Sequence, residues 1–162
     1  MPLAILLTAA LLAGPVTAQS TGKRKSGLPD PPKKDVPYII HADFLVETES
    51  GEAKEETRKD EQVHTVAGAA SAVKTPLAGP EFLFHSETIP PEKLQLYKLE
   101  SKNGRREVVV LRKKKPVARP VRVSLFRIHE KLFKIRVDDS LAAGQYCLSP
   151  DGSNAVFCFA VE

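Results

Sequence analysis

Short apolar runs separated by turn residues occupy the chain from Val36 to its end, and they predict β-strands. The runs recur every 8–15 positions, and several alternate strictly between apolar and polar residues, as in 121–125 and 133–137. This period of two is typical of half-buried strands. The ten expected strands are 36–40, 44–47, 62–66, 81–85, 94–100, 107–112, 121–128, 132–137, 145–148 and 155–161.

The clearest local signal is the dipeptide Asn103-Gly104, which supplies the two positive-φ positions of a type I′ turn. It predicts a tight hairpin between residues 94–100 and 107–112. The expected cross-strand pairs are Leu99 with Val108, Tyr97 with Val110, and Glu100 with Glu107. The last pair opposes two like charges, so Arg106 or Lys102 would have to relieve the repulsion.

Two further hairpins complete the predicted fold. Residues 129–131 join the runs 121–128 and 132–137, and Pro150-Asp151-Gly152-Ser153 joins the last two runs. Residues 51–62 have helical propensity but one apolar residue, so we expect a polar hairpin or loop there instead. About seven to nine short strands in about 125 residues favour an all-β fold, an antiparallel, immunoglobulin-like β-sandwich.

The first 35 residues have a different character. Residues 1–18 hold a short apolar stretch that ends in small residues, which predicts a signal peptide cleaved near Ala18, before Gln19. A buried N-terminal helix is the alternative for this stretch, which is too short to span a bilayer. Residues 19–35 are rich in proline and lysine and predict a disordered basic linker, or alternatively an arm that contacts an anionic polymer. The predicted β-sandwich domain spans residues 36–162.

The two cysteines, Cys147 and Cys158, lie on the two arms of the last predicted hairpin. If that hairpin is centred on Gly152-Ser153, the cysteines are directly opposite and within disulfide range. An exported protein reaches an oxidising compartment, where such a bond forms. Two buried free thiols, or a metal or redox pair, are the alternatives.

Motifs for catalysis and metal binding are absent from the sequence. The four histidines, His41, His64, His85 and His129, are too far apart for the usual metal-ligand spacings. There is no G-x-S-x-G, no S-x-x-K and no glycine-rich phosphate loop. We therefore expect a protein without catalytic activity, metal or cofactor.

Charge is unevenly distributed along the 162 residues, although the net charge is only +4. Residues 41–62 hold eight acidic and three basic side chains, whereas residues 102–136 hold thirteen basic and two acidic ones. The basic region could bind an anion such as a phosphate, a lipid or a polysaccharide, and a solvated loop is the alternative. Its candidate anion-binding residues are Arg112, Lys113, Lys114, Lys115, Arg119 and Arg122. No aromatic stacking pattern accompanies these residues, so nucleic acid is not an expected partner.

Two stretches carry a resemblance. They are 96–110, with Leu96-Tyr97-Lys98-Leu99-Glu100, and 141–162, with Gly144-Gln145-Tyr146-Cys147-Leu148-Ser149 and Ser153-Asn154-Ala155-Val156-Phe157-Cys158-Phe159. They resemble uncharacterised small exported proteins common in acidobacterial genomes, whose C-termini run L-x-P-G-E-Y-A-L-S…S-N-x-V-F-C-F-G-V-D. Here Ala143, Cys147 and Ala160 replace Pro, Ala and Gly of that pattern. The resemblance implies a β-rich exported protein and supplies no site residues.

Together these observations predict a secreted or periplasmic, non-catalytic β-sandwich protein that acts as a binding or structural module. Its partner would be an unknown protein or an anionic envelope polymer. An envelope-associated module that binds anionic lipid or polysaccharide through residues 112–127 is the second hypothesis, and a hydrolase is the third.

Overall fold

The computed structural model describes residues 27–162 and is all-β, with two sheets and one short 3₁₀ turn, η1 (Pro91–Lys93). The predicted signal peptide lies outside the described residues. The strands are β1 (Pro37–His41), β2 (Phe44–Glu47), β3 (Glu49–Glu52), β4 (Lys54–Arg58), β5 (Glu61–Ala67), β6 (Lys74–Thr75), β7 (Glu81–His85), β8 (Leu94–Lys102), β9 (Arg105–Arg112), β10 (Lys115–Pro116), β11 (Val123–His129), β12 (Leu132–Val137), β13 (Gly144–Pro150) and β14 (Ala155–Val161). All ten expected strands are present, and 51–62 forms strands rather than a helix. The expected total of seven to nine is too low, because β3, β4, β6 and β10 are short or polar.

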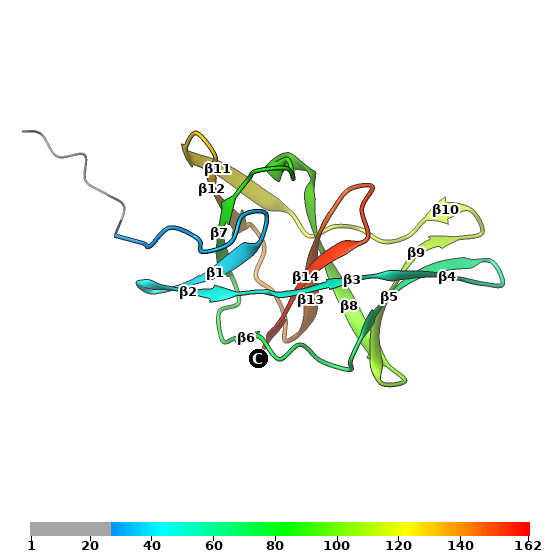
Figure 1. The fold of residues 1–162 in the computed structure, drawn as a ribbon. Coiled ribbons are helices and arrows are strands. Elements are labelled where there is room, and N and C mark those ends of the chain that lie inside the picture. Colours follow the sequence, from blue (N-terminus) through cyan, green and yellow to red (C-terminus); the bar gives the residue numbers. More distant parts are fainter. Residues whose placement is uncertain (1–26) are drawn as a thin grey trace, which may run out of the picture.

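The first sheet has five strands in the order β11-β12-β7-β1-β2. The second has nine, with the main order β3-β14-β13-β8-β9-β5-β4, and β10 and β6 are attached to β9 and β14. All pairings are antiparallel except the two-residue pairing of β6 with β14. Figure 1 shows the second sheet curling into a half-barrel as it passes from β14 and β13 to β5 and β4. Among the described residues no helix is long and apolar enough to cross a membrane.

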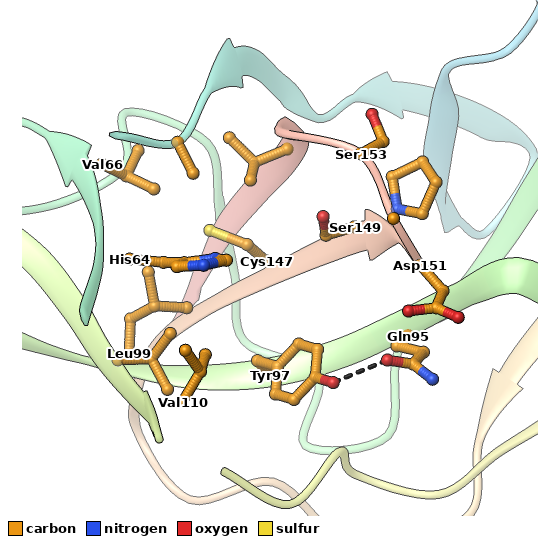
Figure 2. A pocket seen from close by; sticks show the side chains of 15 residues that line it. His64, Val66, Gln95, Tyr97, Leu99, Val110, Cys147, Ser149, Asp151 and Ser153 are labelled. Atoms are coloured by element: carbon orange, nitrogen blue, oxygen red, sulfur yellow. Dashed lines mark hydrogen bonds between the residues drawn. The ribbon is translucent and has the colours of Figure 1, made fainter. Parts of the chain in front are cut away.

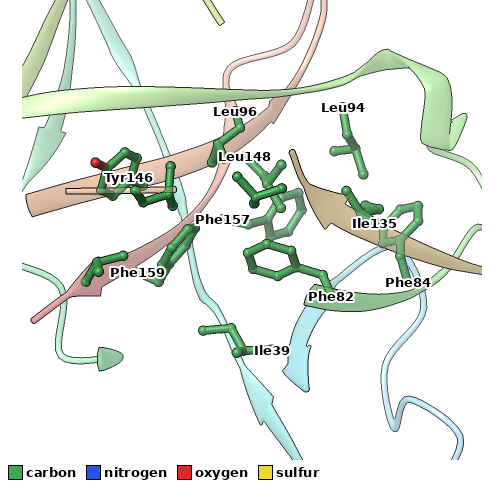
Figure 3. Close-up of a cluster of buried hydrophobic side chains, with 13 residues drawn as sticks. Ile39, Phe82, Phe84, Leu94, Leu96, Ile135, Tyr146, Leu148, Phe157 and Phe159 are labelled. Carbon is green, nitrogen blue, oxygen red and sulfur yellow. The ribbon is translucent and has the colours of Figure 1, made fainter. Parts of the chain in front are cut away.

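One core lies between the two sheets (Figure 3). Phe82 and Phe84 of β7 and Ile135 of β12 come from the first sheet, and Leu148 and Phe159 come from the second. Because side chains of a strand alternate between its two faces, every second residue of β7, β13 and β14 reaches this core. The alternation that predicted half-buried strands therefore produces the main interior of the protein.

The other face of the second sheet carries a smaller apolar cluster. Leu99, Val66, Cys147 and Cys158 are buried there, on the concave side of the half-barrel. These residues alternate with those that face the main core, so β13 and β14 are covered on both faces. The second sheet consequently separates two apolar regions of different size.

The Asn103-Gly104 hairpin forms, but it is shorter than predicted. Asn103 and Gly104 have φ of 52° and 74°, as a type I′ turn requires. Cross-strand pairing begins at Lys102 and Arg105 and ends at Glu100 and Glu107. Beyond this point β8 pairs with β13 and β9 pairs with β5, so the two strands diverge. The predicted pairs Leu99–Val108 and Tyr97–Val110 are therefore wrong.

The opposed Glu100 and Glu107 were expected to need a compensating base. Arg58 of β4 supplies it, with its guanidinium nitrogens 3.0 and 3.3 Å from the Glu107 carboxylate. Lys102, one of the two expected bases, lies 3.7 Å from the Glu107 carboxylate. Arg106, the other expected base, points elsewhere and binds Glu49. The hydrogen bonds from Arg58 hold the pKa of Glu107 below its usual value.

The β11–β12 hairpin has the predicted position, but β11 is more exposed than its alternating sequence indicates. It is the edge strand of the first sheet, and Leu125, Phe126 and Ile128 are each about two-fifths exposed. Phe126 is flanked by the charged ends of Lys134 and Arg136. An edge strand has no neighbour on one side, so alternation alone overstates its burial.

Of the predicted linker, only residues 27–35 are described, and Lys33 and Asp35 bond with the first sheet or with the loop after β7. The Asp35 carboxylate accepts hydrogen bonds from the backbone N–H groups of Glu87, Thr88 and Ile89 at 2.8–3.0 Å. Lys33 forms an ion pair with Glu47 at 2.7 Å. The apolar runs start at Val36, but residues just before it already bond with the folded domain.

Candidate functional site

A pocket of about 120 Å³ lies on the concave face of the half-barrel, where β8 and β9 diverge. Leu99 of β8 and Val108 and Val110 of β9 line it, and Val66 of β5 and Val156 of β14 close it from the sides. Figure 2 shows Val66, Leu99 and Val110, which come from three different strands, pointing toward a common space. The pocket therefore exists because the β8–β9 pairing stops after three residue pairs.

The Cys147–Cys158 disulfide lies at the base of this pocket. The two cysteines are directly opposite in the β13–β14 register, with their Cα atoms 4.0 Å apart. This confirms the predicted bond and the predicted centre of the hairpin. Cys147 and Cys158 are almost fully buried, so the bond fixes β13 to β14 beneath the cavity and contributes apolar sulfur surface to it.

One end of the pocket is polar. The Tyr97 hydroxyl donates a hydrogen bond to Gln95 Oε1 at 2.6 Å, and the Asp151 carboxylate lies at the same end (Figure 2). Burial, and then the negative charge of Asp151, raise the pKa of Tyr97 above its ordinary value. Tyr97 is therefore neutral near pH 7, and Asp151 is the charged group at this end.

The serines of the pocket bond with the backbone. Ser149 Oγ donates to the carbonyl of Ala155 at 2.8 Å, and Ser153 Oγ accepts from the N–H of Ala155 at 3.1 Å. His64 Nε2 lies 3.8 Å from a carboxylate oxygen of Glu55, and no hydrogen bond joins His64 to a serine within residues 27–162. The pocket is concave and mostly apolar, and it holds one carboxylate; these features suit the binding of a small ligand.

The other histidines lie apart from the pocket. His41 stacks on Phe44, His85 is 3.7 Å from Glu87, and His129 is an exposed residue at the end of β11. In the described part of the chain no three His, Cys, Asp or Glu side chains form a group that could hold a metal ion.

The predicted anion-binding residues are only partly gathered. Lys113 and Lys114 form the exposed β9–β10 turn at one tip of the molecule (Figure 1), Lys115 begins β10, and Arg119 follows in the chain. Arg112 forms an ion pair with Glu61 at 2.8 Å. Arg122, at the end of the connection between β10 and β11, forms an ion pair with Asp139 at 2.8 Å. Arg112 and Arg119 also share a hollow of about 310 Å³ with Glu100 and Glu107, so that hollow has mixed charge.

The sequence did not reveal the pocket itself. The signal that could have pointed to it was the like-charged pair Glu100 and Glu107, because it marks the end of favourable β8–β9 pairing. The role of Arg58, 49 residues away from Glu107, depends on β4 lying beside β5 and is not visible in local sequence.

The chain was compared with protein families, curated proteins and solved structures, and none of them matches it. The resemblance to acidobacterial exported proteins therefore stays a prediction. The function has to be argued from the fold and the pocket.

Proposed function

We propose that this protein is an exported, non-catalytic binding module whose half-barrel pocket receives a small, largely apolar group of a ligand. The observation that carries the proposal is the pocket between the diverging strands β8 and β9, lined by aliphatic side chains and by Cys147 of the disulfide. Its volume of about 120 Å³ is close to that of an apolar cavity of about 150 Å³ that binds benzene. Apolar pockets with a few convergent polar groups are the usual form of small-molecule sites.

The test is binding of small probes observed by NMR. Probes of four to six carbons should shift the methyl resonances of Leu99, Val66 and Val110, which line the pocket. The variant Val110→Phe fills the space and should abolish these shifts. Val109→Phe is the matched control, because Val109 lies on the opposite face of β9 and lines the mixed-charge hollow instead. Shifts that persist in Val110→Phe would overturn the proposal.

Export is supported by the disulfide, since such bonds persist in oxidising compartments. N-terminal sequencing of protein recovered from the periplasm or medium of an expressing bacterium should begin at Gln19. An intact Met1 on the recovered protein would contradict this part of the proposal.

The immunoglobulin-like topology also stays a prediction; its support is the face-to-face packing of two antiparallel sheets around one core.

A second candidate function is attachment to an anionic envelope surface. Lys113, Lys114, Lys115 and Arg119 favour it, because all four are exposed and none forms an ion pair with another described residue. Co-sedimentation with anionic vesicles at low salt should fall steeply as salt rises, and zwitterionic vesicles are the control. Unchanged sedimentation after reversal of the three lysines to glutamate would exclude this function.

A further inference from the structure

The pocket is electrostatically one-sided. Of the 15 residues that line it none is lysine or arginine, and Asp151 is the one carboxylate among them. No ion pair to Asp151 occurs within the part of the chain that the structure describes. The pocket therefore presents a free negative charge at one end of an apolar space, and nothing in its lining except His64 can offset that charge.

Asp151 is held in place although its side chain is exposed. It lies in the β13–β14 turn, where its backbone N–H donates to the carbonyl of Lys93 at 2.9 Å. The same turn is closed by a bond from Ser153 N–H to Pro150 at 3.1 Å, and Gly152 has the positive φ of 76° that this turn needs. The backbone of Asp151 is thus fixed at the rim, and no hydrogen bond or ion pair within residues 27–162 uses its carboxylate.

Tyr97 adds a second feature suited to a cation. Its hydroxyl proton is donated to Gln95, so the hydroxyl faces a ligand as a hydrogen-bond acceptor. Its ring belongs to the pocket wall, and an aromatic face attracts a nearby cation. Asp151 and Tyr97 together place hydrogen-bond acceptors at this end of the pocket.

We propose that the group bound in this pocket is an alkylammonium, with its aliphatic stem against Leu99, Val110 and Cys147 and its ammonium between Asp151 and Tyr97. This inference rests on the proposed function and names the ligand class of the same pocket. If about 150 Å³ holds the six carbons of benzene, a cavity of about 120 Å³ holds roughly five non-hydrogen atoms. A lysine side chain and n-butylamine each have four carbons and one nitrogen.

The geometry avoids the cost of burying a charge. Asp151 is exposed, so an ammonium beside it keeps part of its water, whereas the stem is desolvated by the apolar wall. A carboxylate ligand of the same length would meet Asp151 and be repelled. A neutral alcohol would gain the apolar contacts and a hydrogen bond to Asp151, but no attraction between opposite charges.

The experiment compares four probes by NMR titration: n-butylamine, 1-butanol, butyrate and Nα-acetyl-lysine amide. We expect n-butylamine to bind about two- to fivefold more tightly than 1-butanol, the range for an ion pair with an exposed carboxylate, and butyrate to bind more weakly than either. Asp151→Asn should remove the preference for the amine. Asp43→Asn is the matched control, because Asp43 is an exposed carboxylate in the β1–β2 turn, outside the pocket lining, and this variant should keep the preference.

The outcomes separate this inference from the proposed function. Equal binding of n-butylamine and 1-butanol would leave the pocket as a binding site and overturn the alkylammonium assignment. Binding of no probe would overturn both. An amine preference that survives Asp151→Asn would refute the role of Asp151. Binding of Nα-acetyl-lysine amide would identify a lysine side chain of a polypeptide as the source, whereas binding of n-butylamine alone would identify a free amine.

Discussion

Replacing Arg106 should destabilise the protein more than any other single charge change in the second sheet. Arg106 is fully buried, and its guanidinium donates to the carbonyl oxygens of Ala67 and Gly68 at 2.6 and 3.0 Å. It also makes a bidentate pair with Glu49 at 2.8 and 3.1 Å. One side chain thus joins β9 to β3 and to the end of β5.

The variant Arg106→Met keeps most of the side-chain volume and removes all four bonds. Loss of one partner of a buried ion pair costs about 3–5 kcal/mol. Because the Glu49 side chain is 34% exposed, we expect the lower end, about 3 kcal/mol. Arg105→Met is the matched control: Arg105 pairs with Glu56 at 2.7 Å, but it is 36% exposed, so its loss should cost less than about 1 kcal/mol.

Urea unfolding followed by circular dichroism measures both variants. With an m-value of about 2 kcal/mol per M, Arg106→Met should lower the midpoint by roughly 1.5 M, and Arg105→Met by less than about 0.5 M. Adding Glu49→Met to Arg106→Met should recover part of the loss, because it removes the unpaired carboxylate. Equal midpoints for Arg106→Met and Arg105→Met would refute the assignment of Arg106 as the link between these strands.

The ion pair between Arg106 and Glu49 predicts that the free energy of unfolding depends on pH. Burial alone would raise the pKa of Glu49, but the hydrogen bonds from Arg106 and Ser71 outweigh it and hold the pKa below its ordinary value of 4.5. Stabilisation by this carboxylate is therefore complete above pH 4.5 and is lost as the pH falls through the lower, folded-state value. The difference in the free energy of unfolding between the wild type and Arg106→Met should accordingly become smaller in acid.

Three further predictions concern the turn, the disulfide and the N-terminal contact. Replacement of Asn103-Gly104 by Val-Val should cost about 2–4 kcal/mol, since both positions have positive φ; an unchanged melting curve would contradict the hairpin. Under non-reducing conditions Cys147 and Cys158 should not react with an alkylating agent, as mass spectrometry would show, and replacing both by alanine should cost about 2–3 kcal/mol. Burial raises the pKa of Asp35, but hydrogen bonds from Glu87, Ile89 and Thr88 outweigh it and hold the pKa below its ordinary value of 3.8. Asp35→Ala should therefore destabilise the protein by about 1 kcal/mol at pH 7. The loss should become progressively smaller below pH 3.8, as thermal melts would show.

Local sequence predicted every main strand because its signal is local. The alternation in 132–137 and the turn at Asn103-Gly104 each depend on neighbouring residues, and both occur where expected. The disulfide was predictable for the same reason, since Cys147 and Cys158 belong to one hairpin whose centre can be counted. The number of strands was underestimated, because polar strands such as β4 bury little and leave no apolar pattern.

The pocket could not be predicted in this way. Alternation shows that Leu99 and Val108 share a face, but it does not show whether they pair with each other or diverge. Divergence is visible only in the tertiary structure, where β8 pairs with β13 and β9 with β5 over more residues than they pair with one another. The exposure of β11 has a similar origin, because position at a sheet edge depends on the order of distant strands.

The sequence by itself determined an all-β chain, its hairpins and its disulfide, because these depend on residue alternation, turn conformation and short loops. Tertiary structure alone decided the curl of the second sheet, the burial of Arg106 and the placement of Asp151 beside Tyr97. Asp151 and Tyr97 are 54 positions apart in the chain and meet because β8 and β13 are neighbours. Contacts between distant strands are set by the packing of the whole sheet, and the candidate binding site is made of such contacts.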